Sequence, residues 1–250
     1  MFVAAMSRCF PAETLNAALR RLVDLEYTNV EICIHESGGH ISPSEVLADL
    51  DQSVHTCRQT HRLTPCAFSI ETDLPECDEY YAQFAACCKL AKAVKVVTIT
   101  VRSAELGTPF NAEVERLQRL SAIGSVEGVR VGILTEAGRM SQDPDTATVF
   151  CNSVKGLGIT LDPSHYICGP HAGRGFEQVM KHVYHVRLRD TSKDQLQVRV
   201  GQGEVEYGRL INQLRKVGYN RALCVDVAPV PDVDQLAEMR KMRLLLESLL

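Results

Sequence analysis

The sequence predicts an α/β protein with the (β/α)8 TIM barrel fold, formed by one domain over residues 1–250. Short β-branched runs alternate with amphipathic runs along the whole chain, which is typical of parallel strands joined by helical crossovers. The expected strands are Phe2–Ser7, Asn29–Ile34, Cys66–Ile70, Val94–Thr100, Arg130–Thr135, Gly158–Asp162, Val183–Asp190 and Arg221–Val227. Eight such units in 250 residues match a TIM barrel in number and in length.

Helices are predicted from the spacing of apolar residues between these strands. A helix with one buried face carries them at positions i, i+3, i+4 and i+7. Three stripes fit: Leu15, Ala18, Leu19, Leu22 and Val23; Val46, Leu47, Leu50 and Val54; and Leu210, Ile211, Leu214 and Val217.

Two helix starts have a recognisable signature. Ser42-Pro43-Ser44-Glu45 places a capping hydroxyl, a proline at the first helical position and a carboxylate at the third. Asp143-Pro144 repeats this signal before the helix that carries Val149. An open doubly wound sheet is the alternative architecture, but the segment Phe2–Pro11 lacks the glycine-rich turn that follows its first strand.

Composition narrows the class of protein. The net charge of −4 argues against a dedicated nucleic-acid binder, because phosphate binding depends on clustered Lys and Arg. No apolar run is long enough to cross a membrane, and the start of the chain lacks the features of a signal peptide, so we expect a cytoplasmic protein. The ten cysteines include no CxxC pair and are expected to be reduced.

Charged residues gather where the last four strands end. Strand alternation directs Glu136, Asp162, Arg187 and Asp226 to one mouth of the barrel. Such a convergence of carboxylates requires a compensating cation, which is either a divalent metal ion or Arg187 itself.

Further polar residues share the inner face of the barrel. His185 and Arg189 alternate with Arg187 on the seventh strand, and Glu31 and His35 face inward on the second. These five side chains, together with His165 after the sixth strand, are candidate substrate contacts. Glu71, at the end of the third strand, is a similar case.

Several segments together resemble a known family. They are VEICIHE, VGILTEAGRM, LDPSHY, YHVRLRD, GQGEVEYGRLI and RALCVDV, in this order. Their order and spacing resemble those of the xylose isomerase-like TIM barrels, a family of sugar phosphate isomerases and epimerases related to the endonuclease IV group. The resemblance covers nearly the whole chain and implies a TIM barrel that acts on a small sugar or sugar phosphate.

The resemblance also implies a site. In the family, four strand ends supply a divalent metal site, and two Glu residues move a proton beside a carbonyl. Glu136 matches the first Glu, Asp162 and His165 match an Asp-x-x-His motif, and Asp226 stands where the second Glu is expected. The metal-binding His of the family falls on Arg187, which has no lone pair to offer a metal.

Three interpretations remain open. In the first, Mn²⁺, Mg²⁺ or Zn²⁺ is held by Glu136, Asp162 and Asp226, with His165 or His185 as an optional further ligand, and Glu136 and Asp226 act as the acid/base pair. In the second, Arg187 replaces the metal cation by pairing with these carboxylates or by binding an acidic substrate. In the third, the barrel binds a sugar or sugar phosphate without turnover. A metal-dependent nuclease is disfavoured by the net charge and by Arg187.

Two further expectations concern the end of the chain. Arg189, Lys193 and Arg199 lie near Gly201-Gln202-Gly203 and could bind a phosphate group, as the loops after the last strands of TIM barrels often do. The apolar C-terminal helix is expected to cover the barrel, although a homo-oligomer would also use such a surface.

Overall fold

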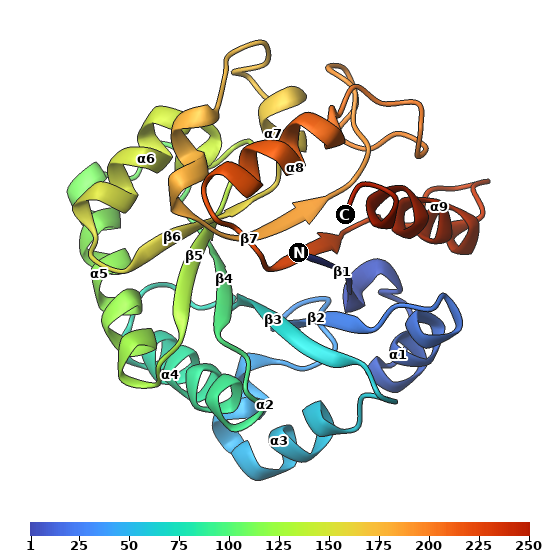
Figure 1. The fold of residues 1–250 in the computed structure, drawn as a ribbon. Coiled ribbons are helices and arrows are strands. Elements are labelled where there is room, and N and C mark those ends of the chain that lie inside the picture. Colours follow the sequence, from blue (N-terminus) through green and yellow to red (C-terminus); the bar gives the residue numbers. More distant parts are fainter.

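The computed structural model describes residues 1–250 and confirms the predicted (β/α)8 barrel. Eight parallel strands follow one another around the barrel in sequence order, and β8 closes it by pairing with β1 (Figure 1). The strands are β1 (Phe2–Met6), β2 (Asn29–His35), β3 (Thr64–Glu71), β4 (Thr98–Arg102), β5 (Arg130–Leu134), β6 (Leu157–Leu161), β7 (Val183–Leu188) and β8 (Ala222–Val225).

Helices lie outside the ring of strands, as Figure 1 shows. They are α1 (Leu15–Asp24), α2 (Pro43–Ala48), α3 (Leu50–Arg58), α4 (Asp78–Ala93), α5 (Phe110–Val126), α6 (Pro144–Ser153), α7 (Ser164–Ile167), α8 (Tyr207–Lys216) and α9 (Gln235–Glu247). Three short 3₁₀ helices are η1 (Ser7–Cys9), η2 (Met140–Gln142) and η3 (Glu177–His182). The apolar faces of the helices and strands form one continuous core.

The start of α2 has the predicted capping box. The Ser42 hydroxyl accepts a hydrogen bond from the Glu45 N–H at 3.2 Å, and the Glu45 carboxylate accepts one from the Ser42 N–H at 2.9 Å. Asp143 caps α6 in the same manner by accepting from the Thr146 N–H at 3.0 Å. Both predicted helix starts are therefore confirmed.

The helix predicted over Val46–Val54 is wrong in one respect, because it is two helices. The chain breaks at Asp49, whose carboxylate accepts from the Gln52 N–H and so begins α3. The break turns the second helix relative to the first, and Leu47 is left 43% exposed. The apolar spacing continues through the break, so periodicity alone could not locate it.

The fourth strand lies further along the chain than predicted. Val94 ends α4, with its N–H bonded to the Leu90 carbonyl, and Lys95 adopts a left-handed backbone with φ of +65°. The β-branched run over 94–97 therefore belongs mainly to a helix terminus, and β4 extends instead to Arg102. The other seven strands differ from their predicted bounds by one or two residues at an end.

The remaining expectations about the chain concern cysteines and termini. All ten cysteines are free. The C-terminal helix α9 packs against β1 and β8, and Met239, Met242 and Leu246 are fully buried there. No helix has both the length and the apolar character needed to span a membrane.

The capping box gives a test of local stability. Replacing Ser42 with Ala leaves the Glu45 N–H without its intramolecular acceptor, and we expect the free energy of unfolding to fall by about 1 kcal/mol. Urea denaturation measures the change. The matched control is Ser125→Ala, on the exposed side of α5, which should stay within about 0.5 kcal/mol of the parent. Equal effects of the two substitutions would contradict the capping role.

Candidate functional site

Seven charged side chains and one histidine, one from the end of each of the eight strands, surround the C-terminal mouth of the barrel. Each comes from the last residue of a strand or from one or two residues beyond it. In strand order they are Arg8, His35, Glu71, Arg102, Glu136, Asp162, Arg189 and Asp226. Cations and carboxylates largely alternate around this ring, which we call the mouth ring.

Asp226 is the most strongly paired member of the ring. Its carboxylate accepts two hydrogen bonds from the Arg8 guanidinium, at 3.1 and 2.5 Å, and a third from Arg189 at 2.8 Å. Burial opposes ionisation of this group, but the Arg8 and Arg189 charges outweigh burial and hold the pKa of Asp226 well below its usual range. Asp226 is therefore ionised at any working pH.

Asp162 shares the same arginine. Its Oδ2 accepts from Arg189 at 2.9 Å, while Oδ1 accepts from the Ser164 hydroxyl and from the Ser164 N–H. Arg189 thus bridges the two acidic residues that end β6 and β8. The Thr135 hydroxyl, at the end of β5, donates to the Asp162 carbonyl at 3.0 Å and fixes the backbone there.

Glu136 lies on the other side of the mouth. Arg102 donates to both of its carboxylate oxygens, from Nε at 2.8 Å and from the terminal Nη2. Arg102 Nη1 also lies 3.5 Å from a Glu71 oxygen, and Arg139 Nε lies 3.5 Å from Glu136. The Glu136 side chain is 15% exposed, against 4% for Asp226, so it is the more open of the two carboxylates.

His165 lies beside Glu136. The N–H of Ala137, the residue after Glu136, donates to Nδ1 of the His165 ring at 3.2 Å. Burial lowers the pKa of His165 against the opposing effect of Asp162, so the ring is neutral at pH 7. A neutral imidazole whose Nδ1 accepts a hydrogen bond carries its proton on Nε2.

Arg187 does not have the partners that the sequence suggested. Its guanidinium donates to Glu31 from Nε at 3.2 Å and from Nη2 at 2.5 Å, and it bonds none of Glu136, Asp162 and Asp226. His185 Nε2 lies 2.8 Å from the other Glu31 oxygen. The expected pairing is wrong because Arg187 lies one inward position deeper than Arg189, where Glu31 is its partner.

These three residues form a closed cluster inside the barrel. The side chains of Glu31, His185 and Arg187 are 0%, 2% and 1% exposed. Burial disfavours the charged carboxylate, but Arg187 and His185 outweigh it and keep the pKa of Glu31 well below normal. A substrate at the mouth would reach these side chains only through the residues above them.

The His35 ring also has its hydrogen-bond partner within the protein. Its Nε2 lies 2.8 Å from the Ser69 hydroxyl, and burial together with Arg8 and Arg187 lowers its pKa to about 3. It is neutral and next to Glu71, whose Oε1 lies 3.8 Å away.

The sequence interpretation missed two ring members, Arg8 and Arg102. Arg102 continues the inward alternation of Thr98 and Thr100, and the misplaced fourth strand concealed it. Arg8 continues that of Ala4 and Met6 beyond the predicted end of β1. Extending each strand by two residues in the same parity would have found both.

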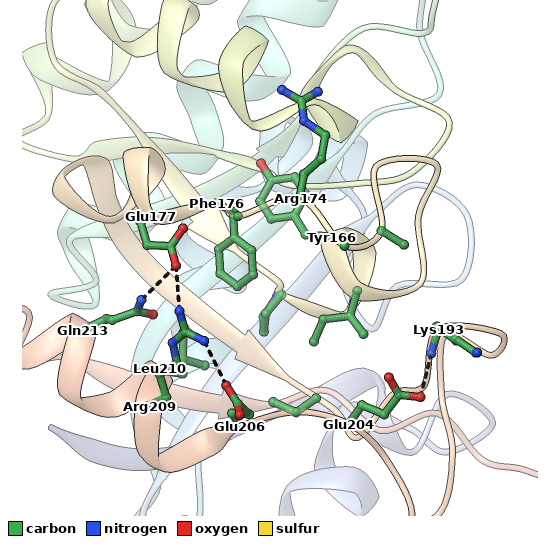
Figure 2. Close-up of a pocket in the computed structure, with 16 residues that line it drawn as sticks. Tyr166, Arg174, Phe176, Glu177, Lys193, Glu204, Glu206, Arg209, Leu210 and Gln213 are labelled. Atoms are coloured by element: carbon green, nitrogen blue, oxygen red, sulfur yellow. Dashed lines mark hydrogen bonds and ion pairs between the residues drawn. The ribbon is translucent and has the colours of Figure 1, made fainter.

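Two cavities lie on the C-terminal side of the barrel. One, of about 680 Å³, is lined by the ends of β3 and β4, with Glu71 and Arg102, by the segments that follow them, and by Arg139 after β5; Arg102 and Arg139 both contact Glu136. The other, of about 640 Å³, lies between the segments that follow β6 and β7 (Figure 2). In that cavity Arg209 pairs with Glu177 and Glu206, and its three cationic residues face three carboxylate residues.

The loop around Gly201-Gln202-Gly203, which was expected to bind phosphate, makes hydrogen bonds within the protein instead. The N–H groups of Gly201 and Gly203 both donate to the Asp190 carboxylate, at 2.7 and 3.1 Å. Arg189 bonds Asp162 and Asp226, and Arg199 lies 3.9 Å from Glu238. A phosphate group finds no free backbone donors at these two glycines.

Comparison with known proteins places the chain in a family. The family model described as xylose isomerase-like TIM barrel matches residues 19–245, so the chain belongs to that family. No sequence among curated proteins matches significantly.

Solved structures with the same fold include sugar epimerases. A D-tagatose 3-epimerase-like protein superposes with a TM-score of 0.77 at 15% identity, covering 100% of this chain and 98% of its own. The 3-keto-D-glucoside 4-epimerase of E. coli gives 0.76 at 14% identity, with 99% of each chain covered. A xylose isomerase-like TIM barrel protein from Mycobacterium smegmatis, in complex with magnesium, gives 0.77 at 13% identity and covers 99% and 97%.

The residues of this chain do not fit a divalent ion at the mouth. Arg187 stands where the family resemblance implies one ligand, and Arg8, Arg102 and Arg189 place permanent positive charges against Glu136, Asp162 and Asp226, where an ion would bind. One other set, Glu31, His185 and Cys224, has ligand atoms within 4.8 Å of one another. Its carboxylate already accepts from Arg187, which places a positive charge where an ion would bind.

The buried Glu31–Arg187 pair makes a prediction about stability. Glu31→Leu leaves a buried guanidinium unpaired, and we expect the free energy of unfolding to fall by about 3 to 5 kcal/mol. The double variant Glu31→Leu with Arg187→Leu removes both charges and should regain most of that loss. Urea denaturation of both variants measures the difference. A double variant as unstable as the single one would show that pairing of charges is not the cause.

The lowered pKa of Asp226 predicts how the stability of the fold depends on pH. Because its folded pKa is lowered, its ion pairs contribute stability above the unfolded pKa of about 3.9, and this contribution is lost as pH falls toward the folded pKa. The parent should therefore lose stability between about pH 5 and pH 2. Asp226→Asn should be less stable at pH 7 and should lose less between those limits. Parallel pH profiles for the two proteins would contradict this assignment.

Proposed function

We propose that this chain is a sugar isomerase that moves a proton beside a carbonyl group without a metal ion. One observation carries the proposal: Glu136, a carboxylate open to the mouth, lies beside His165, a neutral imidazole that presents an N–H. A carboxylate base beside a neutral imidazole is an arrangement that suits enolisation of a sugar. The sugar epimerases among the structures with this fold support the substrate class.

His165 polarises the carbonyl in this proposal. Its Nε2–H donates a hydrogen bond to the carbonyl oxygen, which gains negative charge as the neighbouring C–H bond breaks. The same nitrogen can pass its proton to that oxygen and take one from the adjacent hydroxyl. Ala137 holds the ring in the required tautomer throughout, since its N–H occupies Nδ1.

Glu136 carries the proton. One carboxylate oxygen takes the proton from the carbon beside the carbonyl, the electron pair of the C–H bond forms the enediol double bond, and the proton returns to the neighbouring carbon. Arg102 fixes the carboxylate by two hydrogen bonds, while each oxygen keeps a further lone pair for the substrate. The cavity lined by Glu71, Arg102 and Arg139 would receive the rest of the sugar.

Asp226 takes a different part from the acid/base role that the resemblance implies. A carboxylate held ionised by Arg8 and Arg189 is a weak base and is not available as an acid. We assign it to positioning Arg189 at the edge of the mouth. With one proton carrier, return of the proton to the neighbouring carbon is favoured over inversion at the same carbon, which requires a second carrier on the opposite face.

The second candidate function is binding of a sugar without turnover. The observation that favours it is the pairing of every acidic residue of the mouth ring with a guanidinium. It predicts saturable binding of a sugar and no exchange of substrate hydrogen with solvent.

The experiment is a screen of ketoses and aldoses in D2O, read by NMR for product and for deuterium incorporation. For a sugar that is turned over, we expect Glu136→Gln to lower kcat at least 100-fold. Glu115→Gln, an exposed change on α5 away from both mouth cavities, is the matched control and should leave kcat within about twofold. Activity should persist after dialysis against EDTA.

Three results would overturn parts of the proposal. Full activity in Glu136→Gln would remove the proton carrier. Loss of activity in EDTA that Mn²⁺ or Mg²⁺ restores would establish a metal-dependent reaction. Binding without deuterium exchange for every sugar would favour the second candidate.

A further inference from the structure

A small cavity lies at the end of the barrel opposite the mouth. It has a volume of about 250 Å³, and the first residues of five strands line it: Phe2, Asn29, Thr64, Thr98 and Ala222. Drug-sized ligands occupy about 300 to 1,000 Å³, so this cavity suits a smaller molecule. We call it the lower cavity. The proposed isomerase reaction does not use it.

The charges around the lower cavity are all of one sign. Lys95 and Arg221 line it, and no Asp or Glu does. Arg130 lies against the ring of Tyr184, another lining residue, with its guanidinium carbon 5.3 Å from the ring centroid. No carboxylate forms an ion pair with any of these three cations, whereas the arginines in both cavities on the mouth side face carboxylates.

Arg221 has the least favourable surroundings of the three. Burial and the positive charge of Arg130 both lower its pKa, and its guanidinium makes one hydrogen bond, from Nη1 to the neutral Thr98 hydroxyl at 3.1 Å. A half-buried cation next to another cation requires a nearby negative charge. The protein does not supply one, so a bound anion would relieve both effects.

Much of the remaining wall is apolar. Phe2, Pro65, Val97 and Tyr184 line it, and Phe2 and Val97 are 37% and 48% exposed. His185 also lines the cavity; its Nε2 bonds Glu31 and its Nδ1 makes no hydrogen bond within the protein. The cavity thus combines an apolar surface, two cations and uncharged polar side chains, which include Thr98 and His185.

We propose that the lower cavity binds a small organic anion, with one carboxylate or phosphate group on a compact apolar body. The anionic group contacts Arg221 and Lys95, and the apolar body packs against Phe2, Val97 and Tyr184.

Isothermal titration calorimetry of the whole protein tests the proposal with four probes. Benzoate and phenyl phosphate carry both features, benzamide lacks the charge, and inorganic phosphate lacks the apolar body. We expect one equivalent of benzoate or phenyl phosphate to bind at least tenfold more tightly than benzamide and inorganic phosphate. The tighter of the first two probes identifies the head group.

Substitutions locate the site. Arg221→Gln keeps a donor for Thr98 but loses the charge, and should weaken binding of the better probe at least tenfold. Lys95→Gln should weaken it to a smaller extent, because Lys95 is exposed. Arg20→Gln, an exposed change on α1, is the matched control and should leave the affinity unchanged.

A second measurement does not depend on folding of the variants. NMR of the histidine rings during a benzoate titration should show shifts of the His185 signals, while His171, which follows β6 at the mouth end, stays unmoved. The proposal is overturned if neither anion binds, if benzamide binds as tightly as benzoate, if Arg221→Gln binds like the parent, or if saturation leaves the His185 signals unchanged.

Discussion

The requirement that every charge in the barrel mouth be paired governs this structure. Asp226 receives Arg8 from the segment after β1 and Arg189 from the segment after β7, and Arg189 also holds Asp162. These strands include the β1–β8 pair that closes the barrel. The Arg8–Asp226 ion pair therefore spans the seam at which β1 and β8 close the barrel, directly beyond their backbone pairing.

The choice of arginine as the partner has chemical consequences. A guanidinium does not lose its proton at any working pH, so Asp226 and Glu31, which are buried and have lowered pKa values, are held ionised and withdrawn from proton transfer. Glu136 also pairs with a guanidinium but is the more exposed carboxylate, which is why it is the proposed proton carrier. His165 differs, because burial keeps it neutral and a backbone N–H selects its tautomer. The site therefore contains two kinds of group. The permanently ionised side chains hold their neighbours in position, whereas the His165 ring and the Glu136 carboxylate are the groups proposed to react.

Sequence reasoning predicted the fold well, because alternating apolar patterns directly reflect packing of helices on parallel strands. It also placed Asp162 and Asp226 at one mouth through strand alternation. It could not predict which arginine faces which carboxylate, since that depends on strand stagger. Arg102 was missed because the β-branched run at 94–97, which resembles a strand, mostly ends a helix. In both cases the outcome depends on contacts between distant residues or on where a helix ends, and the local spacing of apolar residues does not contain that information.

Asp190 has a consequence for how this barrel can diversify. The Asp190 carboxylate accepts hydrogen bonds from the N–H groups of Gly201 and Gly203. A Cβ atom at position 203 would collide with that carboxylate. The Asp190 side chain and backbone thus hold the two ends of the segment that follows β7 together, since the Asp190 carbonyl also accepts from the Val198 N–H. Gln197 and Arg199 contact Ala228 and Glu238, so the freedom to change in length or composition falls to residues 192–196, which makes them the natural place for an insertion or a grafted recognition loop.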